Sequence, residues 1–313
     1  MAIQPTKAKG LPGANELRES KAHTINGVLL LDKPTGLTSN AAVQTVRRLF
    51  ERAKAGHTGT LDPLASGLLP ICIGEATKFS HPLLEASKSY RASLRLGWRS
   101  TTGDAEGELS PVAPPDFNES ELSDAVSALT GEIEQLPPMY SAIKVNGQPL
   151  YALARKGISI DRAPRRVTIF RFDATRQLPD TLEIAVSCSK GTYIRVLAED
   201  LGERLGCGAY LTALRRVSIG SIDISEAVGL DLLEAASATE RLALLRPVDL
   251  LLDGLPKVSL TMDDSTRLGH GLSISGCAGS AAGQVRIYSA QGDFLGLGEV
   301  TEDGVLKPKR LVS

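Results

Sequence analysis

The alternation of side chains in residues 89–97 constrains the fold more than any other local pattern. Tyr90 and the apolar residues at every second position after it would share one face of an extended chain, whereas Arg91 and Ser93 would lie on the other. A side-chain period of two is typical of a β-strand with one buried face. We therefore expect a half-buried strand here.

Further strands and helices are predicted on both sides of this segment. Apolar runs bounded by turn residues predict strands at residues 27–32, 167–172 and 182–187. Apolar residues at helical spacing predict helices at residues 38–50, 122–129 and 150–156. Thr38 or Ser39 can cap the first of these helices. Residues 98–115, rich in Gly, Thr, Ser, Asp and Pro, predict a long loop.

The length of 313 residues and the 42% hydrophobic composition allow one sizeable core and a smaller one. A typical size of roughly 150 residues per domain also suggests two domains. Residues 1–24 lack hydrophobic periodicity, so we expect a mobile tail. From residue 255 the chain changes to short strand-like segments between glycine turns, with no clear helix after Leu268, which predicts a small β-rich module.

The charge is balanced, with 35 basic and 36 acidic residues and a net charge of −1. Whole-molecule attraction to a polyanion is therefore absent, and any binding of nucleic acid would need a local basic surface. The sequence contains no apolar run long enough to span a membrane and no export leader. We expect a cytoplasmic protein.

The cysteines and histidines do not suggest a metal site. The cysteines form no Cys-x-x-Cys pair, and the histidines do not have a spacing suited to zinc. We expect reduced and mostly buried thiols at the four cysteines, Cys72, Cys188, Cys207 and Cys277.

Residues 56–69 concentrate three glycines, three hydroxyls, one imidazole and one carboxylate between a helix-like and a strand-like run. This composition predicts a structured loop that holds polar groups at the edge of the core, with Asp62 as its one ionised acid. An alternative is structural, because Asp before Pro commonly begins a helix, with Asp as the N-cap and Pro at the first helical position. His57 has a similar alternative, since an isolated His is more often part of the scaffold than an acid or base.

Residues 188–195 form a second polar cluster, which joins a strand to an amphipathic helix. The Gly-Thr turn within it would place Tyr193 and Arg195 on the first turn of that helix. A helix N-terminus favours anions, and Arg195 can pair with a carboxylate in a bidentate manner. A loop with a carboxylate and a loop with an Arg and a Tyr are what a compact polar active site needs.

Five blocks, in this order along the chain, resemble the TruB family of tRNA pseudouridine-55 synthases, over roughly residues 25–313. The most specific block is the pattern Gly-His-Thr-Gly-x-Leu-Asp-Pro-x-Ala-Ser/Thr-Gly within residues 56–69. The others lie at residues 27–34, 88–91, 138–142 and 190–195. The resemblance implies a reaction in which one uridine of the tRNA T-loop is cut from its ribose at N1, turned and rejoined through C5.

The resemblance also implies three catalytic residues. Asp62 matches the family's essential aspartate, proposed to act as a nucleophile at the sugar or the base, or to stabilise a glycal-like intermediate. Each role needs an ionised carboxylate, and Arg195 matches the arginine that pairs with it, which would lower its pKa by roughly one to three units. Tyr90 matches the aromatic residue that stacks on the target base and is a candidate for moving the C5 proton. The alternative for Tyr90 is ordinary core packing in its strand.

Four further matches imply substrate-binding residues. His57 matches a residue thought to displace the base by occupying space in the tRNA loop. Tyr193 and Leu214 match pocket-lining positions, and Asp104 matches a position that contacts a nucleotide. Reaching a uridine inside a folded loop requires flipping it out, at a cost of roughly a few kcal/mol.

Two matches imply structural support and one position departs from the pattern. Lys33 and Pro34 match a motif held to support the site. Many relatives carry an acid where this chain has Thr101, which puts one local RNA contact in doubt.

The fold implied by the resemblance is α+β: a mixed, mainly antiparallel sheet with flanking helices, the pseudouridine synthase fold. Residues 25–250 would form the catalytic domain, with a cleft between the Asp62 loop and the helix start at Arg195. Residues 255–313 would form a small β-rich, PUA-like RNA-binding domain. No metal or organic cofactor is needed, because both bonds are exchanged within one nucleoside. The expected partner is the T-arm stem-loop of tRNA, bound by a monomer without an obligatory protein partner.

Two other classes of function stay open at this stage. A pure RNA-binding or RNA-folding protein would need basic surfaces and aromatic contacts, but not an ionised Asp62 with its arginine. A guide-dependent synthase of the archaeal or eukaryotic type would share the catalytic blocks and rely on protein partners. The insertions in residues 114–151 match those of bacterial members and favour the stand-alone enzyme.

Overall fold

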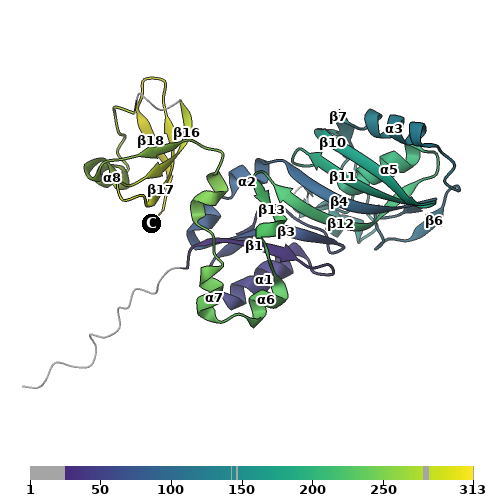
Figure 1. Ribbon diagram of the computed structural model, residues 1–313, viewed down its shortest axis with the longest axis horizontal. Helices are drawn as coiled ribbons and strands as arrows, with labels where there is room; N and C mark the ends of the chain where they lie inside the picture. The colour runs from purple at the N-terminus through teal and green to yellow at the C-terminus, as the bar shows by residue number, and fades with distance from the viewer. Residues whose placement is uncertain (1–24, 142, 146, 278–281, 313) are drawn as a thin grey trace, which may run out of the picture.

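The computed structural model describes residues 25–141, 143–145, 147–277 and 282–312, which form a large domain and a small C-terminal one (Figure 1). The predicted tail, residues 1–24, lies outside these ranges. A ten-stranded sheet runs through the large domain. Its main path follows, in spatial order, β14 (Val228–Gly229), β1 (Gly27–Lys33), β3 (Ala65–Ile73), β12 (Ala209–Ile219), β4 (Lys88–Leu96), β11 (Thr181–Cys188), β10 (Arg165–Leu178) and β7 (Gly131–Gln135).

Most neighbouring strands of this sheet are antiparallel. The pairs β1–β14 and β3–β12 are parallel, whereas β4 pairs with both β11 and β12 in the antiparallel sense. Two short strands lie off the main path, because β2 (Ala55–His57) pairs with β3 and β13 (Ile222–Asp223) pairs with β12. The predicted α+β class, with a mixed and mainly antiparallel sheet, is confirmed.

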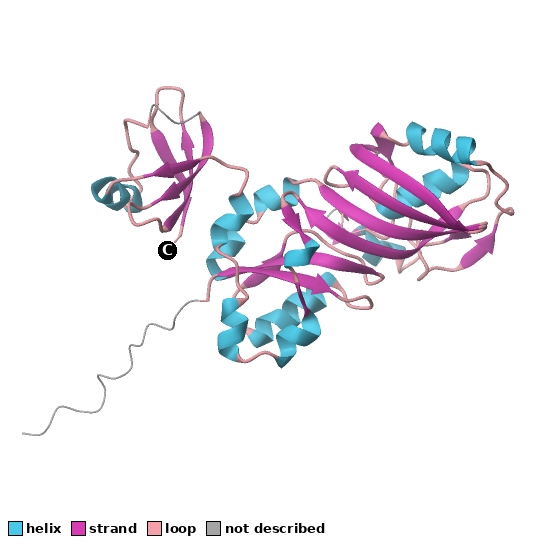
Figure 2. Ribbon diagram, in the orientation of Figure 1, coloured by secondary structure: helices cyan, strands magenta, loops and turns pink. Residues whose placement is uncertain are grey.

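Helices cover the sheet unevenly (Figure 2). The α-helices of the large domain are α1 (Ser39–Leu49), α2 (His81–Glu85), α3 (Glu119–Ala128), α4 (Leu150–Ala154), α5 (Ile194–Arg204), α6 (Leu230–Ala235) and α7 (Ala238–Ala243). Short 3-10 helices occur at η1 (Gly74–Lys78), η2 (Ile224–Glu226) and η3 (Val248–Leu252). The predicted cap of the first helix is Thr38, whose Oγ1 accepts a hydrogen bond from Ala41 N at 3.1 Å.

The apolar run at residues 27–32 forms β1, which is buried on both faces. Leu29 and Leu31 belong to the main core with α1, α3 and α5, whereas Val28 and Leu30 belong to a second core on the other face with η1 and η3. A strand that is buried on both faces needs apolar side chains at every position, which accounts for the absence of alternation in this segment.

The alternating segment forms β4, at the centre of the sheet between β11 and β12. Ala92, Leu94 and Leu96 are buried in the main core, Tyr90 packs against that core, and Arg91 is exposed. The predicted half-buried strand is therefore confirmed. Its position brings Tyr90 beside β12, which contributes to the site described below.

Several local predictions need correction. Residues 98–115 are not a continuous loop, because β5 (Trp98–Ser100) and β6 (Leu109–Pro111) pair as a small hairpin. A second two-stranded unit consists of β8 (Lys144–Val145) and β9 (Gln148–Pro149).

None of the helices in the described part of the chain is long and apolar enough to cross a membrane.

The C-terminal domain is a four-stranded sheet with one helix and its own apolar core. The sheet runs in the order β15 (Lys257–Ser259), β16 (Gly283–Tyr288), β17 (Phe294–Val300) and β18 (Leu306–Leu311), and the helix is α8 (Met262–Gly269). Phe294 meets the large domain at Phe79, with ring centroids 5.4 Å apart and an edge-on geometry. Tyr288 donates its hydroxyl proton to Asp249 Oδ2 at 2.5 Å. The boundaries of the two domains, 25–250 and 255–313, stay predictions.

Candidate active site

Asp62 lies in the loop between β2 and β3, and a strand rather than a helix follows it. Ala65 N donates to Asp62 O at 3.1 Å, and β3 begins at Ala65. The structural alternative, in which Asp62 caps a helix that begins at Pro63, is therefore wrong. The predicted loop is also shorter than residues 56–69, because both of its ends belong to strands.

Helix α1 fixes the residue before Asp62. Ser39, the first residue of α1, donates its Oγ proton to Leu61 O at 2.9 Å and accepts from Leu61 N at 2.8 Å. Two hydrogen bonds from one buried hydroxyl hold the backbone of Leu61 in place, so the direction of the Asp62 side chain is set by the start of a rigid helix.

Arg195 lies at the start of α5, as predicted, and its side chain is buried. Its Nη2 lies 3.0 Å from Asp62 Oδ2, and its Nε lies 3.6 Å from Asp104 Oδ2. It also donates from Nη1 to Thr102 O at 2.7 Å and from Nη2 to Tyr140 O at 2.8 Å. The expected bidentate pair with one carboxylate does not form, since the guanidinium is shared between two carboxylates and two carbonyls.

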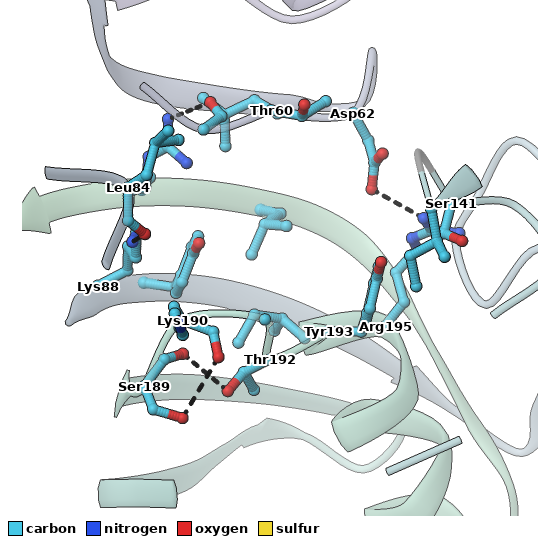
Figure 3. Close-up of a pocket in the computed structure, with 18 of the residues that line it drawn as sticks. Thr60, Asp62, Leu84, Lys88, Ser141, Ser189, Lys190, Thr192, Tyr193 and Arg195 are labelled. Atoms are coloured by element: carbon cyan, nitrogen blue, oxygen red, sulfur yellow. Dashed lines mark hydrogen bonds and ion pairs between the residues drawn. The ribbon is translucent and has the colours of Figure 1, made fainter. Parts of the chain in front are cut away.

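A cavity of about 350 Å³ opens beside this ion pair (Figure 3). Five of the predicted site residues line it: Asp62, Tyr90, Tyr193, Arg195 and Leu214. Pockets that hold small ligands start at roughly 300 Å³, so the cavity is large enough for a single base. Its lining comes from the Asp62 loop, β4, β12 and the start of α5, segments that are distant in sequence.

A second cavity, of about 440 Å³, shares Asp62 and Arg195 with the first. The predicted residues His57 and Asp104 line this one instead. Asp104 is 3% exposed, and its Oδ1 accepts from Thr102 Oγ1 at 2.5 Å and from Glu106 N at 3.1 Å. Asp104 thus pairs with Arg195 through Nε while Asp62 pairs with it through Nη2, and the sequence did not reveal the contact with Asp104. Its contact with a nucleotide stays a prediction.

Lys33 lines neither cavity and is fully buried. Its Nζ donates to Pro34 O and to Leu37 O, each at 2.7 Å. Burial lowers the pKa of Lys33 to about 8, and the charge of Asp62 opposes that change. The two carbonyl bonds fix the turn between β1 and α1. The role of Lys33 and Pro34 in supporting the site stays a prediction.

The electrostatics of Asp62 differ from the expectation. Burial raises the pKa of Asp62 above its ordinary value, and the Asp104 charge adds to the rise. Arg195, through its charge and its hydrogen bond, and Lys33 lower it, but the net direction is upward. The predicted direction of the Arg195 effect therefore holds, but burial, which the sequence did not reveal, has the larger effect and sets the net direction. Arg195 limits a rise that burial causes.

Arg216 is the main site residue that sequence reasoning missed. It lines the first cavity, is 1% exposed and lies opposite Tyr90 in the pairing of β12 with β4. Burial raises the pKa of Tyr90 and lowers that of His57; the Arg216 charge opposes the first change and adds to the second. The alternation in β12 could have identified it, because Leu214 and Arg216 share a face whereas Arg215 points to the other side and pairs with Asp32.

Metal-binding groups are not gathered at this site. Within the described ranges, no cluster of three or more His, Cys, Asp or Glu residues is placed to hold a metal ion. The free thiols of Cys72, Cys188 and Cys207 are buried and that of Cys277 is half-buried.

Three family models match the chain in succession. The N-terminal domain of the TruB family pseudouridylate synthases matches residues 47–194. A tRNA pseudouridylate synthase B C-terminal domain matches residues 195–253, and the C-terminal domain of pseudouridine synthase II TruB matches residues 256–312.

Curated relatives match over nearly their whole length. A tRNA pseudouridine synthase B of Aromatoleum aromaticum is 55% identical over 289 residues, which cover 92% of this chain and 93% of the relative. Proteins of the same name from Dechloromonas aromatica and Ralstonia nicotianae are each 52% identical and cover 92% of this chain, over 96% and 94% of their own lengths.

Solved structures share the fold. A chain of a Cbf5–Nop10–Gar1 complex has a TM-score of 0.70 at 24% identity and covers 92% of this chain and 85% of its own. A chain of an H/ACA RNP bound to a substrate RNA containing 2′-deoxyuridine has the same TM-score at 23% identity and covers 93% and 86%. At this identity the likeness supports the fold alone.

Proposed function

The chain belongs to the TruB family of pseudouridine synthases, and on this basis we propose that it converts the uridine at position 55 of the tRNA T-loop to pseudouridine. Membership makes it an isomerase that acts on uridine in tRNA. The choice of the T-loop position and the role of Asp62 are the parts that we propose.

One observation carries the proposal: the wall of a base-sized cavity holds a carboxylate that is paired with a buried arginine. Asp62 and Arg195 meet at 3.0 Å, and Figure 3 shows the pair at one end of the cavity. A carboxylate must be ionised to attack the ribose or the base, or to stabilise a glycal-like intermediate. A protein that only binds or folds RNA has no use for such a group.

The surroundings of Arg195 support a role in holding Asp62 ready for reaction. Three groups fix the guanidinium before substrate arrives: the carbonyls of Thr102 and Tyr140 and the carboxylate of Asp104. Preorganised charges cost no reorganisation during the reaction. Arg195 therefore opposes the effect of burial and keeps a larger fraction of Asp62 ionised at a given pH.

The walls of the cavity suit a flipped base. Tyr90 supplies a ring on which the uracil can stack, and Tyr193 and Leu214 complete an apolar lining. Stacking on an aromatic side chain returns roughly 1–3 kcal/mol per base, which offsets part of the cost of flipping. Because burial raises the pKa of Tyr90, its phenol is neutral at pH 7. Tyr90 must therefore first give up its own proton before it can accept the one from C5.

We propose that the second cavity receives the part of the loop next to the flipped nucleotide. His57 lines it, and burial lowers the pKa of His57 below its ordinary value of 6.5. His57 is therefore uncharged at neutral pH, so it would displace the base by occupying space rather than by binding phosphate. The PUA-like role of the C-terminal domain in RNA binding is part of the same proposal.

A guide-dependent mechanism is the runner-up. The solved structures that share this fold include Cbf5 in complex with Nop10 and Gar1. The bacterial relatives, at 52–55% identity, instead match over nearly their whole length. We therefore propose a stand-alone cytoplasmic monomer.

Mapping of pseudouridine on a tRNA transcript tests the proposed site. The purified chain, without added proteins, should convert position 55, detected as a carbodiimide-dependent stop in primer extension. A transcript with cytidine at that position should give no stop anywhere. Conversion at another uridine, or conversion that needs an added protein, would contradict the proposal.

A further inference from the structure

Arg216 places a buried positive charge at the cavity that holds Asp62 and Tyr90. Its Nε donates to Leu68 O at 2.8 Å and its Nη2 donates to Gly59 O at 3.1 Å. Strand β12 can approach this closely because Gly67 faces it: a Cβ at Gly67 would lie 2.3 Å from Arg216 O. The guanidinium is therefore built into the Asp62 loop and the neighbouring strand.

This charge has no carboxylate partner among the described residues. Arg195 lies against Asp62 and Asp104, and Arg215 forms a bidentate pair with Asp32 at 2.6 and 3.0 Å. Arg216 instead donates to carbonyl oxygens, and it lies opposite Tyr90 in the pairing of β12 with β4. An unpaired buried charge is costly, so its presence at a cavity is best accounted for by a negative charge that appears there.

Lys88 strengthens this argument, because it is a second buried cation on the same cavity. Its Nζ donates to the carbonyls of Leu84 at 2.6 Å and Ala86 at 2.5 Å. It lies at the end of the cavity opposite Asp62 and Arg195 (Figure 3). We call Lys88 and Arg216 the unpaired side of the cavity, and Asp62, Arg195 and Asp104 the paired side.

The proposed reaction generates negative charge on the base. When the N1–C1′ bond breaks, its electron pair stays on N1 and spreads onto O2 and O4, so the uracil becomes an anion. C1′ is left as an oxocarbenium ion or becomes bonded to the Asp62 carboxylate. C5 then forms the bond to C1′, which neutralises that cation or displaces the carboxylate, and C5 loses its proton to a base while N1 takes one up, which restores a neutral product. Attack of Asp62 on the base would also push an electron pair onto O4.

We propose that Arg216 is a catalytic residue that stabilises the anionic uracil while its bond to the ribose is broken. This inference rests on the proposed function and adds a residue to it. Arg216 lies beside the ring on which the base would stack, and a fixed donor at the point where charge develops is the usual form of electrostatic catalysis. Binding of an RNA phosphate is the competing explanation for this cation.

The test compares Arg216→Gln with Arg216→Lys, and with Arg215→Gln as the matched control on the opposite face of the same strand. Single-turnover rates are measured at saturating enzyme on tRNA that carries uridine or 5-fluorouridine at position 55. Nuclease digestion and chromatography detect pseudouridine from uridine. From 5-fluorouridine they detect a C-linked nucleoside that keeps its fluorine, because C5 then has no proton to lose and the C6=N1 bond adds water instead. Fluorine withdraws electrons from the ring and stabilises the anion without help from the protein.

We expect Arg216→Gln to lower the rate on uridine about 10²–10³-fold, as removal of one preorganised donor does, with tRNA binding unchanged. The loss should be smaller by about tenfold or more on 5-fluorouridine, because that leaving group needs less stabilisation. Arg216→Lys should lose less on uridine than Arg216→Gln, and Arg215→Gln should match wild type on both substrates.

Equal losses on the two substrates would overturn the proposal and leave Arg216 a structural residue. A loss confined to tRNA binding would replace it with phosphate binding. If Arg216→Gln does not fold, judged by its melting temperature, the same substrate comparison is made with Arg216→Lys and is decided in the same way. Failure of wild type to convert either tRNA would instead reject the proposed function.

Discussion

The two sides of the active-site cavity handle charge in opposite ways. On the paired side, Arg195 lies between Asp62 and Asp104, and each charge has a partner before substrate binds. On the unpaired side, Lys88 and Arg216 contact carbonyl oxygens and have no ion pair within the described chain. The difference suggests that one side prepares a group of the enzyme for reaction, while the other waits for a charge on the substrate.

The largest effect on the paired side is expected from Arg195→Ala. Removing one partner of a buried ion pair costs roughly 3–5 kcal/mol. That cost falls on folding stability. Removal of one preorganised donor typically lowers turnover about 10²–10³-fold, and because the Asp62 side chain is 38% exposed we expect the lower end, about 10²-fold. Binding of tRNA should change far less. Steady-state kinetics measures turnover, and a filter-binding assay measures tRNA binding. Equal losses in turnover and in binding would count against the assigned role.

Asp104→Asn should have a smaller effect, because Asp104 acts on the reaction through Arg195. Loss of a partner that orients a reacting group typically costs roughly 10–100-fold, and we expect about tenfold in turnover. Asp104→Glu, which keeps the charge, is the matched control and should recover part of the rate. Wild-type turnover in Asp104→Asn would show that the second carboxylate has no part in the site.

The pH dependence distinguishes Arg195→Ala from Asp104→Asn, because the two substitutions should shift the Asp62 pKa in opposite directions. Asp62 must be ionised, and burial raises its pKa above the ordinary aspartate value of 3.8. As the pH is lowered, wild-type turnover should therefore start to fall while the pH is still above 3.8. Removing the Arg195 charge should move this acid limb to higher pH, because Arg195 lowers the Asp62 pKa. Removing the Asp104 charge should move it to lower pH, because Asp104 raises that pKa. A pH–rate profile in which both variants shift the limb in the same direction would contradict the arrangement.

The smallest effect is expected from Lys88→Met on the unpaired side. Burial lowers the pKa of Lys88 to about 8, so its charge is lost as the pH rises through that value. We expect turnover at pH 7 to fall only about threefold, because carbonyls already bind the ammonium. Turnover of wild type should decline above pH 8, and turnover of Lys88→Met should decline less. A similar decline in both proteins would show that the Lys88 charge has no part in the reaction.

Local patterns in the sequence predicted the elements that carry the site. The alternation in β4, the cap at Thr38 and the start of α5 at Ile194 all depend on interactions within a few residues, and each is present in the structure. Helices α6 and α7 were not predicted, nor was the β5–β6 hairpin inside the expected loop. Helix α7 does carry a local signal, the capping box of Ser237 and Glu240, whereas α6 packs against β1, which is distant in sequence.

The site residues also divide into those that a motif identified and those whose role depends on distant contacts. A motif identified Asp62 and Arg195, but the motif could not show that Asp104, more than 40 positions from Asp62, holds the same guanidinium. Arg216 belongs to no motif in the sequence, and its burial depends on the parallel pairing of β12 with β3. The net rise in the Asp62 pKa could not be predicted either, because desolvation depends on the segments that the fold brings around the carboxylate rather than on its neighbours in sequence.

The central claim is that Asp62 is the catalytic carboxylate of a synthase that acts without partners. Tritium release from tRNA labelled at uridine C5 tests it most directly, with purified wild type and Asp62→Asn compared and tRNA binding measured for both. We expect release by wild type, release at background by Asp62→Asn, and binding retained by both proteins. Release by Asp62→Asn at the wild-type rate, or tight binding without release by wild type, would contradict the claim.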